Sequence, residues 1–595
     1  MRRWISIFLR GLTFLLVAVT VSSPPAHAWR EAPRTPKNQP PSVEVCPGRV
    51  TVVGAKLFKL TKVERSFVCG DSGSDSWKRV PMSQAKYHLR TFLQERGRYQ
   101  PEFSEDGDRL IVRLGPLTRV RSWTVNGAPK DADVQDRRRV KGRILTPKLL
   151  NEIEQWLVRR LKSRGYPCPD AKSKADPVTG DVVVEVTPGP QQNVIAVTEE
   201  PVLRMNPGVP RRFDAFKVGK PFNDDLLSLS ADRIETDGLL QSTYFKTTCE
   251  PEGAVLEQKT FAGRPRIVSV GFGANTEGVV LVKGSWKHTR LEDNASLFEA
   301  EGFASYKRQK LAVSSRLYPF KPTSRWHLLP IGEIDHQRES EFHFLSGDVQ
   351  INAAGGWDDQ KIGFKFSFGP DLNYVETYRG AQPGLTRFLT LRSRIELMSH
   401  YFEYYLTRPR TGYRASFTVN FGNSNLLSEV TAQRFLLDGE YLYNFRHYEP
   451  PLLVFGVRGG LYGTFARGDA ATLAKLPPNY RFYLGGSPDL RGWGRRELPS
   501  EDGALSAAFL SFEIRLAELL PGGFQPFGFF DAGIFGSKAL RFDAPVYYSP
   551  GGGLRWESPV GMIRGTVGHG FKAGGNQAGT KDGHWQFYVS FGEEF

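Results

Sequence analysis

From residue 263 onward, apolar and polar residues alternate in short segments separated by glycine-containing turns. Successive side chains of a strand point to opposite faces, so a period of two predicts strands with one apolar and one polar face. Residues 263–595 are far more chain than one soluble β-sandwich of about 100 residues needs. The pattern predicts a transmembrane β-barrel, in which tilted strands of about 9–11 residues face lipid on one side and a lumen on the other.

The last segment, HWQFYVSFGEEF, shows this alternation most clearly. Its polar face carries Gln586, Tyr588, Ser590 and Glu594. Lipid offers no hydrogen-bond partners to a free strand edge, so we expect this last strand, near residues 585–591, to close on the first, near residues 266–274. The apolar face predicted to lie against lipid consists of Trp585, Phe587, Val589, Phe591 and Phe595.

Before residue 263, apolar residues recur at helical spacing in three segments. Residues 82–99 and 146–166 end near Gly97 and Gly165, while residues 223–245 have Ser242 at the corresponding place. A turn and a strand follow each helix, as in DPVTGDVVVEV. Recurrence at about 70-residue spacing indicates an internal repeat, which we interpret as three β-α-α-β-β domains. A single irregular α+β domain is the alternative.

The N-terminus has the layout of a secretory signal peptide. Arg2 and Arg3 precede the apolar run GLTFLLVAVTV, and a small-residue cleavage site ends at Ala28. An uncleaved anchor helix is the alternative, although prolines follow the short run at once. The predicted organisation is a signal peptide at residues 1–28, a Pro-rich linker at 29–42, repeat domains at 43–117, 118–190 and 191–262, and a barrel at 263–595.

The chain has four cysteines, Cys46, Cys69, Cys168 and Cys249. An even count in an exported protein predicts disulfides, but the sequence leaves their pairing open. No Cys-x-x-Cys motif and no His/Cys cluster with zinc-ligand spacing occurs, so we expect no metal site.

The net charge of +16 raises the question of a nucleic-acid partner. The basic residues are scattered along the chain, and export argues against nucleic acid. Local runs such as DRRRVKGR, residues 136–143, are typical of a solvated face. Attraction to anionic lipid headgroups or to an acidic partner is the second interpretation.

The stretch YRFYLGGSPDLRGW places Arg491 at the tip of a glycine-rich loop between apolar residues. If the loop enters a barrel lumen, this arginine needs a carboxylate on the inner wall, since a buried unpaired charge is costly. Glu513 in LSFEIRL and Asp531 in PFGFFDAGIF are the candidates, and a guanidinium fork suits bidentate carboxylate binding. A surface hairpin with a solvated arginine is the alternative. Glycines that permit the tight turn stand at positions 485, 486, 492 and 494.

Taken in order, these motifs resemble those of the BamA/TamA superfamily of outer-membrane assembly factors. The segment FYLGGSPDLRGW resembles the lumen loop motif of this superfamily, and FFDAG resembles its strand motif. The segment GGGLRWESPVGMIRG resembles the signature of its penultimate region. By resemblance, Arg491 docks on the inner wall through Asp531 and Glu513. The resemblance assigns Phe482, Gly485, Gly486, Arg491, Gly492 and Trp493 to the loop motif, and Phe587, Val589, Phe591 and Phe595 to the terminal β-signal at the seam.

The resemblance implies periplasmic POTRA domains, of the β-α-α-β-β form, followed by a sixteen-stranded barrel in the outer membrane of a Gram-negative bacterium. Three repeats favour the TamA-like branch, which would work with a TamB-like periplasmic protein on unfolded outer-membrane or autotransporter substrates. Two departures from the family pattern are the missing helix-end glycine of the third repeat and the four cysteines.

The implied function is insertion or secretion of such substrates through a seam between the first and last strands, with no enzyme activity and no cofactor. A two-partner secretion transporter, which exports a polypeptide through the lumen, is the main alternative. The Pro-rich segment at residues 30–42 is poor material for the plugging helix of such a transporter. A passive porin gives no reason for the repeats. A hydrolase has no recognisable motif here, since G-x-S-x-G, a phosphate-binding loop and H-E-x-x-H are absent from the sequence.

Overall fold

The chain divides into two compact units, Met1–Leu117 and Thr118–Phe595. No described helix is both long and apolar enough to cross a membrane. The predicted signal peptide, most of the predicted linker, and Phe595 lie outside the described residues. The computed structural model describes residues 41–54, 57–70, 80–134, 137–380, 383–406, 408–425, 427–468, 470–499, 502–559, 561–573 and 584–591.

The first unit is a small α+β domain with a four-stranded sheet of order β1-β2-β4-β3. Strands β2 and β4 are parallel, and both outer strands pair antiparallel. Helix α2 begins with a capping box between Thr61 and Glu64. The elements are β1 (Ser42–Cys46), β2 (Val50–Val53), α2 (Lys62–Cys69), α3 (Met82–Glu95), β3 (Glu102–Asp106) and β4 (Arg109–Arg113).

The second unit begins with two further α+β domains, with sheet orders β5-β7-β6 and β8-β10-β9. Each again has a parallel central pair and an antiparallel third strand. The elements are β5 (Ser122–Asn126), η2 (Lys130–Ala132), α4 (Pro147–Lys162), β6 (Asp170–Ala175), β7 (Asp181–Thr187), β8 (Val194–Glu199), η4 (Pro210–Phe213), α5 (Asp224–Asp237), β9 (Ser242–Glu250) and β10 (Gly253–Phe261).

The predicted α+β class of these domains is confirmed, but they depart from the predicted β-α-α-β-β order in two ways. The first domain has an additional strand, β1, before β2, and the helices of the other two domains differ. In the second and third domains, a short 3-10 turn, η2 or η4, stands where the first helix of the predicted repeat was expected. Before η4 the segment PVLRMNPGVP contains three prolines and a glycine. Proline lacks a backbone donor and clashes with the preceding turn, so a regular helix cannot form there.

The third repeat does have a helix-end glycine, and the prediction that it lacks one was wrong. Helix α5 ends at Asp237, and Gly238 is its C-cap in the left-handed conformation, with φ of 78°. Ser242, which had been aligned with the glycine, begins β9. The helix is about one turn shorter than the apolar pattern indicated, because the pattern continues into the following strand.

Two disulfides resolve the pairing that the sequence left open. Cys46 and Cys69 join β1 to the end of α2 within the first domain. Cys168, which follows α4, joins Cys249 on β9, so this bond links the second domain to the third. The second bond closes a sequence separation of 81 residues and couples the two domains covalently.

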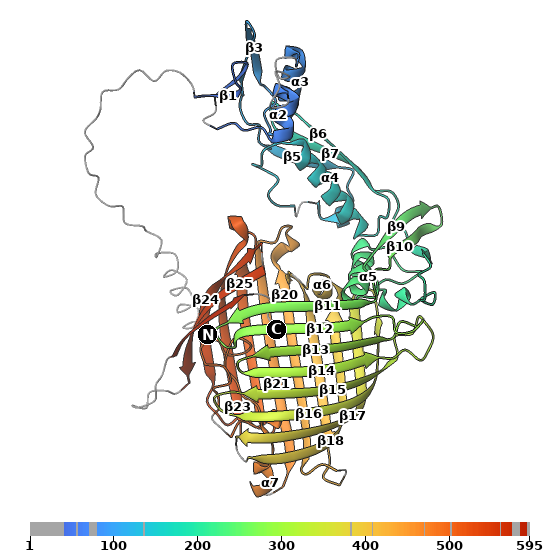
Figure 1. Ribbon diagram of the computed structural model, residues 1–595, viewed down its shortest axis with the longest axis vertical. Helices are drawn as coiled ribbons and strands as arrows, with labels where there is room; N and C mark the ends of the chain where they lie inside the picture. Colours follow the sequence, from blue (N-terminus) through green and yellow to red (C-terminus); the bar gives the residue numbers. More distant parts are fainter. Residues whose placement is uncertain are drawn as a thin grey trace, which may run out of the picture. The chain divides into compact units, whose positions relative to one another are not determined.

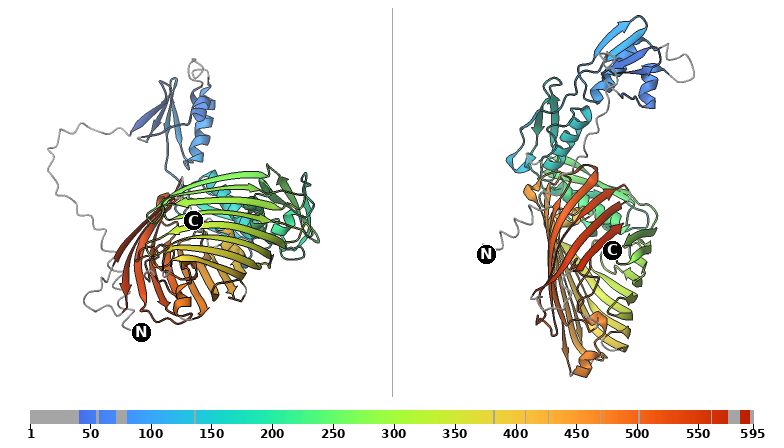
Figure 2. Two further views of the ribbon diagram at one scale, coloured as in Figure 1. Left: turned by 60° about the horizontal axis from the view of Figure 1, so that its bottom comes forward. Right: turned by 90° about the vertical axis from the view of Figure 1, so that its left-hand side faces the viewer.

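The rest of the second unit is a closed antiparallel barrel of sixteen strands, as predicted. Figure 1 shows β11 to β18 on the near wall, and Figure 2 shows the C-terminal strands, in orange and red, continuing that wall. The strands are β11 (Arg266–Asn275), β12 (Val279–His288), β13 (Leu297–Ser305), β14 (Arg308–Arg316), β15 (His327–Arg338), β16 (His343–Asp358), β17 (Ile362–Arg379), β18 (Gly384–Ser399), β19 (Gly412–Gly422), β20 (Thr431–Asn444), β21 (Leu453–Arg467), β22 (Ser506–Leu516), β23 (Phe524–Gly536), β24 (Tyr547–Ser558), β25 (Gly561–Lys572) and β26 (His584–Phe591).

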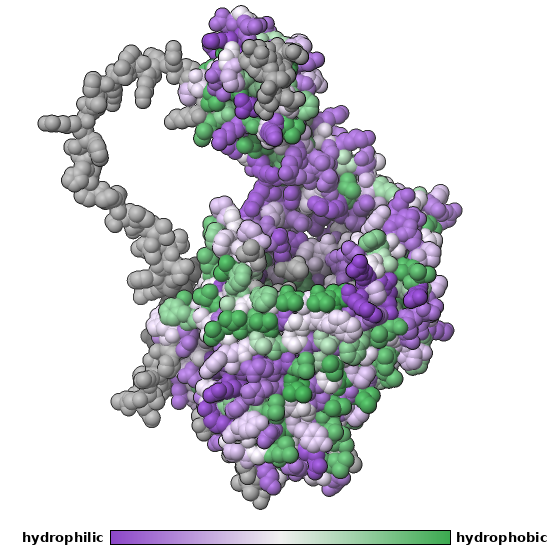
Figure 3. Space-filling model, viewed as in Figure 1, coloured by the Kyte–Doolittle hydropathy of each residue, from purple (hydrophilic) through white to green (hydrophobic). Residues whose placement is uncertain are grey.

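Side chains alternate across the barrel wall as the sequence pattern requires. In β26, Trp585 and Phe587 face outward and are 63% and 62% exposed. Tyr588, which lies between Phe587 and Val589, points to the lumen and is buried. In β11, Val268 and Phe272 likewise point outward. Figure 3 shows apolar residues spread over the outer wall that faces the viewer. An apolar exterior and a polar interior are what a lipid-embedded barrel requires.

Candidate functional site

The segment between β21 and β22, residues 468–505, forms a loop that packs inside the barrel. Bridges between Phe482 and Ala504 and between Leu484 and Leu498 make its two arms run antiparallel. At its tip, Gly485 has φ of 118°, a conformation that L side chains rarely adopt. An apolar cluster anchors the loop to β22 and β24 through Phe482, Leu484, Leu490, Trp493, Ala507 and Tyr547.

Arg491 is one of the most deeply buried side chains of the protein, with 1% of its surface exposed. Its Nε and Nη2 donate to the two carboxylate oxygens of Asp531 on β23, at 3.0 and 2.7 Å. Its Nη1 donates to Glu513 on β22 at 2.8 Å, and Nη2 also donates to Ser511 at 2.9 Å. The guanidinium plane lies 3.5 Å from the ring centroid of Phe529. The structure therefore brings together the arginine and both carboxylates that the sequence singled out.

The charges around Arg491 are matched by a shared network. Glu513 also accepts hydrogen bonds from Arg515 and Arg564, each at 3.1 Å. Asp531 is fully buried and accepts from the backbone amide of Arg491 as well as from its side chain. Because buried charges are stable only when they are paired and hydrogen-bonded, this network fixes the loop to the wall at one position.

Glycines allow the loop backbone to touch the wall. A Cβ atom on Gly492 would lie 2.4 Å from the backbone nitrogen of Gly570 on β25. A Cβ atom on Gly568 would lie 2.5 Å from the carbonyl oxygen of Arg491. No side chain fits between the two backbones at either position, so Gly492 is required by close approach.

The seam between the first and last strands is short. Among the described residues, β11 and β26 pair only at Ala274–Phe591 and Asn275–Ser590. By contrast, β11 pairs with β12 along its whole length, from Arg266–His288 to Asn275–Val279. Strand β26 pairs with β25 from Ile563–Phe591 to Gly570–His584.

The loop also bridges this seam, which the sequence did not predict. The backbone amide and the hydroxyl of Ser487 donate to the carboxylate of Glu277, in the β11–β12 turn, at 3.1 and 2.8 Å. On the other side of the seam, the hydroxyl of Tyr588 on β26 donates to the carbonyl oxygen of Trp493 at 2.5 Å. The loop thus holds the first hairpin and the last strand at once.

The sequence offered partial signals for these missed residues. The period-two pattern places Phe529 and Tyr588 on the lumen-facing side of their strands, so the sequence could have predicted that these two side chains point into the barrel. Glu277 and Arg564 gave no such signal, because their contacts join segments far apart in the chain. Phe587, Val589 and Phe591 face outward on β26, away from the loop.

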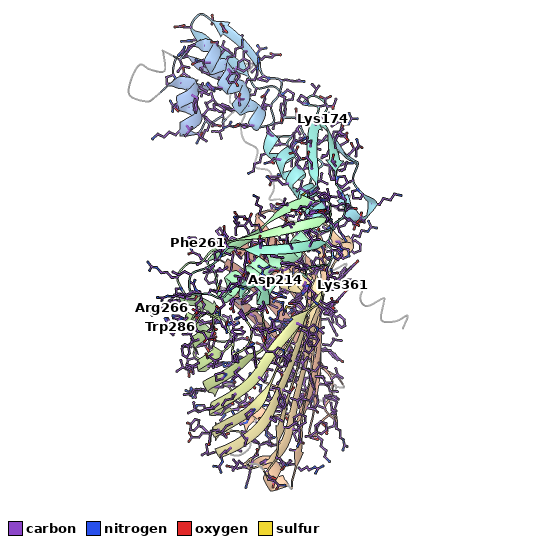
Figure 4. All side chains as sticks on the ribbon, turned by 90° about the vertical axis from the view of Figure 1, so that its right-hand side faces the viewer. Lys174, Asp214, Phe261, Arg266, Trp286 and Lys361 are labelled. Atoms are coloured by element: carbon purple, nitrogen blue, oxygen red, sulfur yellow. A yellow bond between two sulfur atoms is a disulfide. The ribbon has the colours of Figure 1, made fainter. Side chains whose placement is uncertain are left out.

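A second ionic network ties the third domain to the base of the barrel. Arg233 on α5 pairs with Asp358 at the end of β16, at 2.9 Å, and with Glu403 on α6 (His400–Tyr404), at 2.6 Å. Burial alone would raise the pKa of Glu403, but the hydrogen bond from Arg233 holds this pKa below its usual value. Figure 4 labels Asp214 and Lys361 in this region, and also Phe261 and Arg266, between which the chain passes from the third domain into β11.

The contacts described around the loop and the seam are structural. Across the described residues, no group of three or more His, Cys, Asp or Glu side chains is placed to hold a metal ion. Arg491 pairs with Glu513 and Asp531 on the wall, and Glu513 also pairs with Arg564 on β25. The features that define the site are a docked lumen loop and a seam with two strand pairs among the described residues.

A closed sixteen-stranded barrel with an inward loop and N-terminal α+β domains defines a class of outer-membrane protein. Residues 404–595 match the Omp85 superfamily domain, which here runs from the last residue of α6 through β19 to β26 and includes the lumen loop. Residues 404–595 therefore form an Omp85 superfamily domain.

Similarity to solved structures is distant. BamA from Haemophilus ducreyi lacking POTRA domains 1–3 is 15% identical, with a TM-score of 0.47, over 80% of this chain and 99% of that chain. CdiB from Acinetobacter baumannii is 14% identical, with a TM-score of 0.45, over 86% of this chain and 97% of that chain. CdiB from Escherichia coli is 12% identical, with a TM-score of 0.43, over 89% and 99%. Values this low do not assign a function.

Proposed function

We propose that this protein is an assembly factor that inserts β-barrel or autotransporter-type substrates into the outer membrane through the seam between β11 and β26. The observation that carries the proposal is the seam itself, with two residue pairs among the described residues. Residues 266–273 of β11 have no strand partner on the seam side in the described part of the chain. A row of unpaired backbone groups is a template for another strand.

The physical need for such a template comes from the bilayer. Each backbone N–H and C=O of an incoming strand must be hydrogen-bonded before the strand enters lipid, since an unsatisfied group there costs several kcal/mol. Pairing with the free edge of β11 by β-augmentation satisfies these groups strand by strand. The proposed activity needs no catalytic residue.

Strand length next to the seam supports the same function. Strand β11 has 10 residues and the described part of β26 has 8, whereas β17 on another side of the barrel has 18. About 9–11 tilted residues just cross the hydrocarbon core, so the wall at the seam has no excess length. A short wall favours local thinning of the bilayer, which lowers the barrier to insertion there.

In this proposal, the lumen loop braces the wall while the seam opens. Arg491, with Asp531 and Glu513, would act as a structural and gating element. The three N-terminal domains would dock a periplasmic protein, which the resemblance identifies as TamB-like, and would pass unfolded substrates to the barrel. Each of their sheets ends in edge strands, such as β6 and β9, which pair on one side only within the described residues and so suit the capture of extended segments.

The test is a reversible lock of the seam. Asn275 and Ser590 form one of the two seam pairs, so replacing both with cysteine allows a disulfide between β11 and β26. The protein is reconstituted in liposomes, and insertion of an unfolded barrel is followed by protease protection. We expect insertion to be faster than in empty liposomes, to stop when the lock is oxidised, and to return with reductant.

A matched control uses Ser269→Cys with Ser285→Cys, which joins β11 to β12, strands that stay paired throughout. This lock should leave insertion unchanged. If the substrate inserts equally fast with the seam lock oxidised and reduced, strand templating at the seam is excluded. Export of a polypeptide through the lumen despite the oxidised lock would favour the two-partner secretion alternative.

A further inference from the structure

The lumen beside the seam contains arginines that the Arg491 network does not use. We propose that these arginines form a binding site for a carboxylate carried on the polypeptide strand that enters the seam. The inference rests on the proposed function and deepens it, because it assigns a chemical feature to the substrate strand: an Asp or Glu side chain that faces the lumen.

The site is a cavity of about 630 Å³ between the loop and the barrel wall. Its lining includes Ala274 and Asn275 of β11 and Tyr588 and Ser590 of β26, so the cavity lies directly behind the seam. A strand that takes the place of β26 beside Ala274 and Asn275 when the seam opens would therefore present its lumen-facing side chains to this cavity.

Arg434 is the clearest unpaired charge in the lining. It stands on β20 at an inward position, between the outward-facing residues of that strand. Its Nε is buried without a hydrogen-bond partner, and no described carboxylate forms an ion pair with its guanidinium group. Its described neighbour is the ring of Phe482, whose centroid lies 5.6 Å away.

Two further arginines complete the site. Arg458 on β21 donates one long hydrogen bond, of 3.5 Å, to the carbonyl oxygen of Ser487. Arg496 on the loop donates to the amide oxygen of Gln337 at 2.8 Å. Neither forms an ion pair with a carboxylate in the described parts of the chain, so Arg434, Arg458 and Arg496 keep donors available for an anion.

The other arginines of the cavity already have acceptors. Arg491 and Arg564 bind Glu513, and Arg495 pairs with Glu339 at 2.8 Å. A fourth, Arg481, donates to backbone carbonyl oxygens, among them those of Leu473 and Leu476.

The acidic residues that line the cavity also accept hydrogen bonds from other groups of the protein. Glu277 accepts from Ser487, and Asp438 accepts from the hydroxyl of Tyr462 at 2.5 Å. Asp489 accepts from the backbone amides of Gly485 and Leu490, each at 2.6 Å. These carboxylates hold the loop and the lumen wall, and none forms an ion pair with Arg434, Arg458 or Arg496 among the described residues.

Geometry favours a peptide carboxylate over a lipid headgroup. A guanidinium group binds carboxylates through two parallel hydrogen bonds, and burial strengthens such bonds. The cavity lies on the lumen side of the seam, where alternate side chains of a paired strand point. A lipid beside the barrel meets only the outward side chains, such as Phe272 and Phe587.

The test compares two substrates in the liposome insertion assay. Both are the same unfolded barrel, and the lumen-facing positions of its last strand carry Glu in one and the isosteric Gln in the other. With the wild-type protein, we expect the Glu substrate to insert about tenfold faster, the effect of one charge-assisted hydrogen bond. In Arg434→Gln/Arg458→Gln, the two rates should become equal.

Controls separate recognition from folding. Arg414→Gln removes an arginine of β19 that does not line the cavity, and it should keep the tenfold preference. Folding of each variant is checked by heat-modifiable migration on a gel. Where the double variant does not fold, Arg458→Gln alone is used, and a preference that stays at tenfold in that variant contradicts the assignment.

Further outcomes are decisive. Equal insertion of both substrates by the wild-type protein, at rates above those of empty liposomes, would overturn this inference and leave the proposed function standing. If no substrate inserts, binding of Glu and Gln strand peptides to the detergent-solubilised protein is measured by fluorescence anisotropy, and equal affinities would overturn the inference. If inorganic phosphate or anionic lipid vesicles abolish the preference for the Glu substrate, these anions compete for the arginines. That outcome would show a general oxyanion site instead of a site for a substrate carboxylate.

Discussion

At the scale of single residues, one guanidinium group joins three separate parts of the barrel. Arg491 belongs to the loop, Glu513 to β22 and Asp531 to β23, and all three side chains are largely removed from solvent. Taking a charge out of water is costly unless it is paired, so each of these buried charges is stable only while its partners are present. The loop position is therefore sensitive to a change of a single side chain.

Replacing Arg491 tests this dependence. Arg491→Ala leaves Asp531 buried without its partner, and we expect a loss of about 3–5 kcal/mol in the stability of the docked loop. Arg491→Lys should recover only part of it, because an ammonium group cannot reproduce the fork. The midpoint of urea unfolding, followed by gel migration, measures the loss. Arg414→Ala, which breaks a partly exposed pair with Glu440, should cost at most about 1 kcal/mol.

Glu64 provides a residue-scale prediction in the first domain. The hydrogen bond from Arg96 and the amide of Thr61 hold the pKa of Glu64 below its usual value. The charged form therefore stabilises the fold above pH 4.5, and this contribution disappears as pH falls through the lowered pKa. We expect Glu64→Gln to reduce the amide protection of α2 at pH 7 by about 1 kcal/mol.

Hydrogen exchange at two pH values gives the readout for Glu64. After correction for intrinsic exchange rates, the difference between wild type and Glu64→Gln should be large at pH 7 and small near pH 3. Glu105→Gln serves as the control, because its contact with Lys86 is long, at 3.9 Å, and exposed. An equal difference at both pH values would mean that the charge of Glu64 does not stabilise α2.

At the scale of elements, the loop and the last strands are fitted backbone to backbone. The position of Gly492 against Gly570 leaves no room for a side chain, so the loop lies flat on β25. Loop docking therefore depends on two kinds of contact, the ionic network of Arg491 and this close approach. They lie one residue apart in sequence.

Gly492→Ala tests the close approach independently of charge. A Cβ atom 2.4 Å from the nitrogen of Gly570 forces the loop away from the wall, which also lengthens the bonds of Arg491. We expect faster trypsin cleavage at Arg495 and Arg496 and slower substrate insertion. Gly565→Ala on the same strand, β25, meets nothing within 4 Å and should behave like wild type. If trypsin cleaves Gly492→Ala at the same rate as the wild type, the added methyl group is accommodated by a shift of β25 and not by displacement of the loop.

At the scale of the whole molecule, the second unit is held at its base, while its seam has two strand pairs among the described residues. The Arg233 network and the Cys168–Cys249 disulfide constrain the second and third domains. Arg138 adds a contact from the second domain, since it donates to the carbonyl oxygens of Pro450 and Pro451 in the β20–β21 connection. Opening of the seam is therefore expected without release of these domains.

Arg233→Ala tests that organisation. Loss of this arginine leaves the buried carboxylates of Asp358 and Glu403 with fewer partners, and we expect about 3–5 kcal/mol less protection of α5 and α6 in hydrogen exchange. The barrel strands around the seam should keep their protection. Lys259→Ala removes a more exposed pairing and should have little effect. A loss of protection that reaches β11 and β26 would show that base and seam are coupled.

Much of the architecture could be predicted from the sequence because its signals are local. The alternation in β26, the helix-end glycines at 97 and 165 and the turn glycines of the loop each depend on a few neighbouring residues. The helices replaced by η2 and η4 were mispredicted because repetition was extended to segments rich in proline and glycine. Gly238 was missed because the apolar pattern runs on from α5 into β9.

By itself, the sequence determined that the second half alternates in period two, and it predicted Glu513 and Asp531 as the candidate partners of Arg491 if the loop enters a lumen. Tertiary structure alone decided the disulfide pairing, the two seam pairs seen among the described residues, the contacts of Glu277 and Tyr588 with the loop, and the arginines of the cavity that form no ion pair with a described carboxylate. The physical reason is that alternation and turn formation depend on neighbours in the chain. The register at which a barrel closes, and the charges left facing one another across its lumen, depend on the tilt and stagger of all sixteen strands together.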